Sequence, residues 1–168
     1  MLNWASYNRE QIKFNPKIID LNAIIAENII NIKYSAKQKG ISIITDYSEA
    51  FKAYADEDMV KLIIRNLLSN ALKFTCNDGF IRIELNKRVN YIEVKIVDTG
   101  LGISEDNIEK IMSDNQFYST YGTASEKGTG LGLKLCKSFI AQNKGELIID
   151  SKLNIGTSFS FTLPMVNI

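Results

Sequence analysis

The chain has 168 residues, of which 45% are hydrophobic and 23% are charged, and this size and composition predict one domain with a proper hydrophobic core. Its 20 basic and 19 acidic residues leave a net charge of +1, which argues against a general attraction to nucleic acid or to an anionic membrane. No run approaches the ~18 apolar residues of a membrane span, and the N-terminus lacks the features of a signal peptide. We therefore expect a cytoplasmic domain that binds anions only locally.

The chain contains no histidine and two cysteines, Cys76 and Cys136. The absence of histidine removes the commonest general base, the commonest metal ligand and any phosphohistidine acceptor from this chain. The cysteines are far apart and lack the spacing of metal ligands, so reduced thiols are the favoured interpretation.

The N-terminal half alternates between strand-like and helical patterns. Residues 1–12 carry a partial apolar stripe that is typical of the end of a helix. The other expected elements are a strand at 14–21, an amphipathic helix from 21 to a stop at Gly40, strands at 41–47 and 52–55, and a helix at 57–74 capped by Asp56.

The C-terminal half repeats the alternation around one irregular segment. Residues 113–129 are polar and aperiodic, which indicates a functional loop or lid inside a compact domain. The expected elements are a hairpin of 80–85 and 91–97 joined by the polar residues 86–88, a short helix capped by Ser104 and ending near Met112, a helix at 130–143 ended by Gly145, and a closing hairpin of 146–150 and 157–163.

Three polar residues share one stripe of the helix expected at 57–74, because Asn66, Asn70 and Lys73 are spaced i, i+4 and i+7. A neutral amide oxygen is a suitable ligand for Mg²⁺, and a lysine places a point charge against a phosphate. Asn70 is the first candidate for the metal ligand. The alternative for this triplet alone is a solvated helix face.

Asp98 ends an alternating run and is followed by Gly100 and Gly102, so its carboxylate is expected at the mouth of a strand beside a loop that a ligand can approach closely. A carboxylate only accepts hydrogen bonds, and it therefore favours the exocyclic amino group of adenine over the carbonyl of guanine. The alternative is an ordinary turn aspartate before glycine.

A second glycine cluster, Gly128, Gly130 and Gly132, immediately precedes the helix expected at 130–143. The backbone N–H groups at such a helix start can hold phosphate oxygens. Without companion motifs, glycines at this junction more often indicate a tight turn.

Taken in order, four segments resemble the N, G1, G2 and G3 boxes of the catalytic ATP-binding domain of sensor histidine kinases. They are Asn66–Phe74, Asp98–Gly102, Gly128–Leu133 and Gly156–Thr157. The resemblance covers nearly the whole chain, and residues 117–126 resemble the ATP lid of that family. It implies the fold of the gyrase, chaperone and histidine kinase superfamily: a two-layer α/β sandwich whose mixed, mostly antiparallel sheet is covered on one face by helices.

The resemblance also implies roles for individual residues. Asn70 is implied to hold Mg²⁺, with Asn66 as a second candidate, and Asn66 and Lys73 are implied to act at the phosphates. Asp98 is implied to read adenine, and Thr157 to support its pocket. The other residues implied to surround ATP are Phe74, Gly100, Gly102, Ile103, Gly128, Thr129, Gly130, Leu131, Gly132 and Leu133.

The implied activity is transfer of the ATP γ-phosphoryl to a histidine on a separate domain, and from there to an aspartate of a response regulator receiver domain. Residues 1–12 resemble the end of the dimerisation helix that bears this histidine, with the catalytic domain at 13–168 and its lid at about 113–129. We expect a monomeric fragment of a homodimeric protein, and anchoring of the full-length protein in the inner membrane stays open.

Two other functions remain open. In ATPases of the same superfamily a glutamate that activates water stands where this chain has Asn66, and an amide cannot take a proton, so rapid hydrolysis is not favoured. A non-catalytic ATP-sensing interaction module would share the same binding residues.

Overall fold

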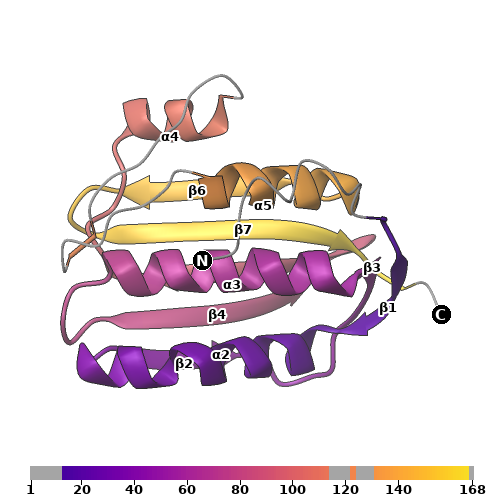
Figure 1. Cartoon of the computed structure of the whole chain (residues 1–168), viewed down its shortest axis with the longest axis horizontal. Helices are drawn as coiled ribbons and strands as arrows, with labels where there is room; N and C mark the ends of the chain where they lie inside the picture. The colour runs from indigo at the N-terminus through magenta and orange to yellow at the C-terminus, as the bar shows by residue number, and fades with distance from the viewer. Residues whose placement is uncertain (1–12, 114–121, 124–130, 167–168) are drawn as a thin grey trace.

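The computed structural model describes residues 13–113, 122–123 and 131–166. They form two layers, with three helices packed on one face of a five-stranded sheet (Figure 1). The strands are β1 (Pro16–Asp20), β2 (Ser42–Asp46), β3 (Lys52–Asp56), β4 (Phe80–Lys87), β5 (Tyr91–Asp98), β6 (Leu147–Lys152) and β7 (Gly156–Pro164). The helices are α2 (Leu21–Gln38), α3 (Glu57–Phe74), α4 (Glu105–Met112) and α5 (Leu131–Gln142).

The main sheet has the strand order β2-β4-β5-β7-β6. Only β2 and β4 are parallel, and the other three pairings are antiparallel. Helices α2, α3 and α5 cover one face, whereas α4 lies apart from this layer (Figure 1). The predicted two-layer α/β sandwich with a mixed, mostly antiparallel sheet is thus confirmed.

A second, two-stranded sheet pairs β1 with β3 at one end of the molecule (Figure 1). An isolated bridge between Ala53 of β3 and Met165 joins it to the end of β7. The small sheet therefore continues the large one around the start of α3, which follows β3 without a loop.

Helix α3 is the centre of the core. Asp56 precedes it, and the Asp56 carboxylate accepts a hydrogen bond from the Met59 N–H at 3.0 Å, which caps the helix as predicted. Its apolar positions recur at helical spacing, so that one face packs under α2, α5 and the sheet. The buried residues of that face are Met59, Val60, Ile63, Ile64, Leu67, Leu68 and Ala71.

Every helix and strand expected within the described residues is present, with small differences at the ends. Strand β4 extends to Lys87, so residues 86 and 87 belong to the ladder and the turn of the hairpin is 88–90. Ser104 is the residue before α4, but its side chain makes no capping hydrogen bond. Residues 1–12 and most of 113–129 lie outside the described part of the chain.

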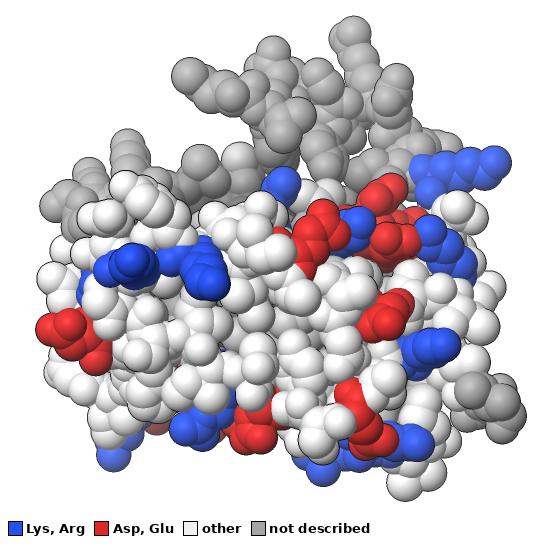
Figure 2. All heavy atoms as spheres, turned by 90° about the horizontal axis from the view of Figure 1, so that it is seen from below, with Lys and Arg blue, Asp and Glu red and all other residues white. Residues whose placement is uncertain are grey.

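The surface gives no sign of a broad charged patch on the face drawn in Figure 2, where basic and acidic side chains are interspersed. Within the described residues, no helix is long and apolar enough to cross a membrane. The charge distribution on this face agrees with the expectation that anion binding is local.

Candidate functional site

Asp98 lies on the helix-covered side of β5 because alternate residues of this strand are buried. Ile92, Val94, Ile96 and Asp98 form that buried series, as the period of two along a strand requires. Only 4% of Asp98 is exposed. The three preceding inward-facing residues of β5 are aliphatic, and the fourth carries a carboxyl group.

The Asp98 carboxylate is fixed by the backbone on both sides. Its Oδ1 accepts a hydrogen bond from the Gly100 N–H at 2.8 Å, and the backbone N–H of Thr157 on β7 donates another. Burial outweighs these two hydrogen bonds and raises the pKa of the carboxyl from 3.8 to about 6. Because burial disfavours the ionised form of this carboxyl, a further hydrogen-bond donor from a ligand would stabilise the carboxylate.

Gly100 brings the Asp98 loop against the end of α3. A Cβ atom at Gly100 would lie 2.4 Å from the Phe74 carbonyl oxygen and 2.7 Å from Asp98 Oδ1. The Leu101 N–H also donates to the Phe74 carbonyl at 3.1 Å. The Asp98 carboxyl and the C-terminal turn of α3 therefore meet, and the protein itself already requires glycine at position 100.

Gly102 has a φ of +69°, and a Cβ atom there would lie 2.0 Å from the Lys152 carbonyl oxygen at the end of β6. Both the left-handed backbone and the close approach favour glycine. The chain's own backbone thus fills the space beside Gly100 and Gly102. The fold itself therefore requires both glycines, in addition to the expected role of letting a ligand approach.

Thr157 is buried opposite Asp98, and its hydroxyl lies 2.8 Å from Ser151 Oγ on β6. The Ser151 hydroxyl donates to the Gly156 carbonyl at 2.9 Å and accepts from the Ile103 N–H at 2.8 Å. Ser151 thereby holds the Ile103 backbone and the Thr157 side chain together. Sequence reasoning missed Ser151, since only the register of β6 against β7 brings it to this place.

Asn66 lies where α3 meets α5. A Cβ atom at Gly132 would lie 3.6 Å from Asn66 Oδ1, so the start of α5 runs close beside the amide. The Asn66 side chain also hydrogen-bonds the thiol of Cys136, and burial raises the pKa of that thiol to about 12. Cys136 is therefore a neutral thiol that packs against the Asn66 side chain. Asn66 and Gly132, predicted from separate motifs, therefore lie close together.

Asn70 and Lys73 occupy the last two turns of α3. Asn70 is half-buried, and within the described residues its amide makes no hydrogen bond. The Lys73 ammonium lies 4.7 Å from the centroid of the Phe74 ring, which is a cation–π distance. The Asn70 oxygen is available to a ligand from outside the described chain.

The C-terminal end of α3 also holds the two described residues of the expected lid, Gly122 and Thr123. The Thr123 N–H donates to the Lys73 carbonyl at 3.1 Å, and the Thr123 hydroxyl donates to the same oxygen at 3.0 Å. The Lys39 ammonium donates to the Leu72 carbonyl at 3.1 Å and to Thr123 Oγ1 at 3.0 Å. A cation at these last carbonyls complements the helix dipole, and this role of Lys39 was not foreseen.

The predicted site residues thus form two groups along α3. One group lies at the C-terminal end of α3, beside the Asp98 loop, and the other lies nearer the middle of α3, beside α5. Leu131, Gly132 and Leu133 form the first turn of α5. Gly128, Thr129 and Gly130 lie outside the described residues.

The donor set suits Mg²⁺ better than a tightly ligated metal. The described residues contain no group of three or more histidine, cysteine, aspartate or glutamate side chains placed to hold a metal ion. Mg²⁺ takes only one or two protein ligands and keeps its other positions for water and phosphate oxygens. The Asn70 amide, which makes no hydrogen bond within the described residues, fits that requirement.

The chain is similar to known proteins in both sequence and fold. The family described as histidine kinase-, DNA gyrase B- and HSP90-like ATPase matches residues 55–167. The adaptive-response sensory kinase SasA of Prochlorococcus marinus (strain MIT 9313) is 33% identical over 154 residues, which cover 90% of this chain and 41% of that protein. The sensor-like histidine kinase SenX3 of Mycolicibacterium smegmatis is 30% identical over 146 residues, covering 87% and 38%.

Among solved structures, the catalytic domain of histidine kinase ThkA superposes with a TM-score of 0.77 at 28% identity, covering 90% of this chain and 96% of that one. The fold and the family match thus define an ATP-binding domain of the kind found in sensor histidine kinases. The chain belongs to the family of histidine kinase-, DNA gyrase B- and HSP90-like ATPases. It spans less than half the length of the two sensor kinases compared above.

Proposed function

We propose that this domain binds Mg²⁺–ATP and donates the γ-phosphoryl group to a histidine on a separate dimerisation domain of the same protein. The observation that carries the proposal is the buried Asp98 carboxylate, held by two backbone N–H groups where β5 meets the end of α3. Its remaining acceptor capacity is directed to the exocyclic amino group of adenine, which is a donor.

The phosphate end of the nucleotide is assigned to the polar stripe of α3 and to the start of α5. Lys73 supplies a positive charge, and Asn66 lies beside Gly132 at the α3–α5 contact. Backbone N–H groups at the beginning of α5 favour anions. Orientation and electrostatics are then the main contributions of the domain, because phosphoryl transfer needs little covalent chemistry from the protein.

Asn70 is the proposed ligand of Mg²⁺, with Asn66 as a second candidate. The metal, when bound, would neutralise charge on the phosphate oxygens. Within the described residues, no other group forms a hydrogen bond with the Asn70 amide and competes with the metal for it.

The partner that receives the phosphoryl group from the histidine is proposed to be a response regulator receiver domain. ThkA, whose catalytic domain resembles this chain, has been solved in complex with the response regulator protein TrrA. The proposed arrangement places the dimerisation domain before residue 13, next to the strand that opens this domain.

Hydrolysis of ATP by this domain alone is the less favoured function. The position of the water-activating glutamate of related ATPases holds Asn66, whose amide cannot accept a proton. An ATP-sensing module without transfer would bind nucleotide equally well, and it differs only in failing to phosphorylate a histidine.

Calorimetric titration with a non-hydrolysable ATP analogue tests the binding step. We expect binding that strengthens with Mg²⁺, that weakens in Asp98→Asn, and that loses its response to Mg²⁺ in Asn70→Ala. A guanine analogue should bind weakly to the wild-type protein. Absence of any nucleotide binding contradicts the proposal, and nucleotide binding without transfer to the histidine-bearing domain supplied in trans favours the sensing module.

A further inference from the structure

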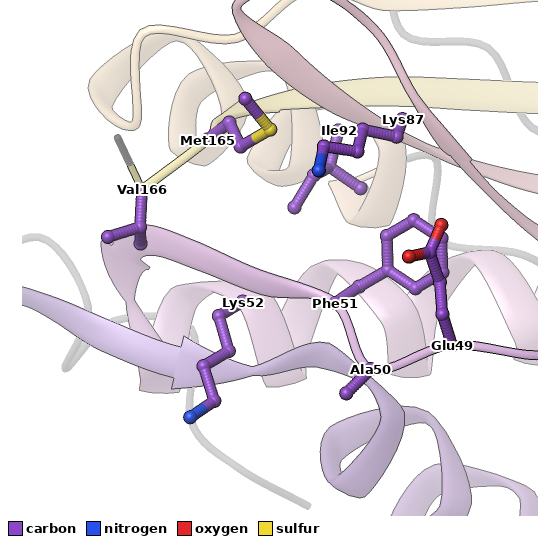
Figure 3. A pocket seen from close by; sticks show the side chains of 8 residues that line it. All are labelled: Glu49, Ala50, Phe51, Lys52, Lys87, Ile92, Met165 and Val166. Carbon is purple, nitrogen blue, oxygen red and sulfur yellow. The ribbon is translucent and has the colours of Figure 1, made fainter. Parts of the chain in front are cut away.

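A cavity of about 650 Å³ lies at the opposite end of the main sheet from Asp98, and Figure 3 shows the side chains that line it. It opens where β4 ends and β5 begins, whereas Asp98 is the last residue of β5. Its volume is within the range of roughly 300–1,000 Å³ that is usual for small-molecule sites. None of its lining residues belongs to the nucleotide site proposed above.

The floor of the cavity is apolar. Phe51 and Ile92 line it and are 5% and 2% exposed, and the Met165 side chain forms part of the wall. These three residues come from the loop before β3, the start of β5 and the residue after β7. Phe51 and Ile92 close the cavity from below but expose little surface, so the apolar part of a ligand would lie mainly against the half-buried Met165 and Val166.

The walls are held in place by backbone hydrogen bonds and by one side chain. The Asn22 amide donates to the Glu49 carbonyl at 2.9 Å and accepts from the Phe51 N–H at 2.8 Å. On the other side the Met165 N–H donates to the Asn90 carbonyl at 3.2 Å. The cavity is therefore formed before any ligand enters, which reduces the entropy that binding must offset.

The charged side chains that line the cavity carry a net positive charge. Lys52, Lys87 and Glu49 line the cavity, and within the described residues none of their side chains makes an ion pair or hydrogen bond. Lys87 extends over Ile92 toward Met165, while Lys52 points away from these side chains (Figure 3). Lys87 is thus the cation placed to meet an anion above the apolar floor.

We propose that this cavity binds a small amphiphilic monocarboxylate, with its aliphatic chain against Met165 and Val166 and its carboxylate at the Lys87 ammonium. Lys52 adds positive potential at the rim, and Glu49 disfavours ligands with several negative charges. The site is separate from nucleotide binding and does not depend on it.

The test uses octanoate as the probe and two-dimensional amide NMR of the 168-residue chain as the readout. We expect saturable shifts confined to residues near Phe51, Ile92 and Met165, with a Kd on the order of 1 mM. Lys87→Gln should weaken binding about fivefold or more, and Glu49→Gln should strengthen it about twofold, since each removes one charge of opposite sign. Lys33→Gln, on the exposed face of α2, is the matched control and should leave the Kd unchanged.

Several results would overturn the proposal: no saturable shift up to about ten times the expected Kd, equal binding of octylamine, or the same Kd in Lys87→Gln and Lys33→Gln. The spectrum of each variant reports whether it is folded, and the opposite effects expected for the two charge changes keep the test valid if one variant is unstable. An ATP-analogue titration of the same samples shows separately whether the nucleotide site is intact.

Discussion

The Asp98 carboxyl group is buried among aliphatic neighbours, and its remaining acceptor capacity makes it the residue on which nucleotide recognition depends most directly. Asp98→Asn replaces an acceptor-only group by one that also presents a donor to the adenine amino group. A charge-assisted hydrogen bond contributes about 1.5–3 kcal/mol, so the affinity for an ATP analogue should fall about 10- to 100-fold. Calorimetry measures this change, and an unaltered affinity would remove Asp98 from the proposed site.

Nucleotide binding should also depend on pH through the same residue. Because burial raises the pKa of Asp98 to about 6, the ionised fraction falls about tenfold between about pH 7 and pH 5. We expect the affinity for the ATP analogue to fall with it in the wild-type domain. Asp98→Asn should show a flatter profile over the same range, and parallel profiles would contradict this explanation.

The stability of the free domain should respond in the opposite direction. Between pH 3.8 and about 6, the folded protein keeps a proton on Asp98 that the unfolded chain has released, so this group's contribution to the free energy of unfolding decreases as pH rises. The decrease amounts to about 3 kcal/mol across the window. Urea denaturation of wild type and Asp98→Asn at several pH values measures it, because the difference between the two isolates this carboxyl from all others.

The chemistry of single residues was more predictable from sequence than their neighbours were. Residue type and spacing identify Asp98, Asn66 and Gly132, and the structure places the last two close together. Ser151 was not selected, because a serine within a strand carries no signal until the neighbouring strand is known. The same holds for Lys39, whose contacts depend on how α2 lies against the end of α3.

At the scale of elements, α3 depends on its first turn. The Asp56 carboxylate accepts from the Met59 N–H at 3.0 Å and from the Asn15 N–H at 2.8 Å. Asp56→Ala should lower the free energy of unfolding by roughly 1–2 kcal/mol, as for other buried N-caps. Asp58→Ala, an exposed carboxylate in the same turn, is the control and should lose less than about 1 kcal/mol. Equal losses in urea denaturation would mean that charge rather than capping matters.

The boundaries of elements were predictable where a cap or stop residue coincides with a change of period. Asp56 before α3 and Gly40 after α2 are of this kind, and Gly40 has the φ of +67° that suits a glycine stop. The polar composition of residues 86–88 suggested a turn, but β4 continues to Lys87 because β5 offers backbone partners there. Pairing in the sheet decided this boundary, and local composition did not.

At the scale of the whole molecule, Asn143 joins the end of α5 to the junction of β3 and α3. Its buried amide accepts from the Asp56 N–H at 2.7 Å and donates to the Phe139 carbonyl at 2.8 Å. Asn143→Leu leaves the buried Asp56 N–H without its partner, and we expect a loss of about 1–3 kcal/mol in the free energy of unfolding. Gln142→Leu, which is exposed at the neighbouring position, should change it by less than about 0.5 kcal/mol in the same denaturation experiment.

The resemblance to a known family implied the fold class, but the pattern of residues did not determine the strand order. Nothing in the alternation of β2 shows that it pairs in parallel with β4, or that β1 and β3 form their own small sheet. These pairings depend on which edges remain once α2 and α3 have packed, and this is settled by long-range contacts.

Strand β7 passes from the neighbourhood of Asp98 to the wall of the cavity lined by Phe51 and Met165. Thr157 and Pro164 are seven residues apart on it, which at about 3.4 Å per residue is a separation of about 24 Å. Two occupants at the ends of this strand are too distant for direct electrostatic contact at physiological ionic strength. The affinity of one site should therefore not depend on whether the other is occupied, unless β7 moves as a unit. Slowed hydrogen exchange along the whole of β7 when one ligand binds would reveal such coupling.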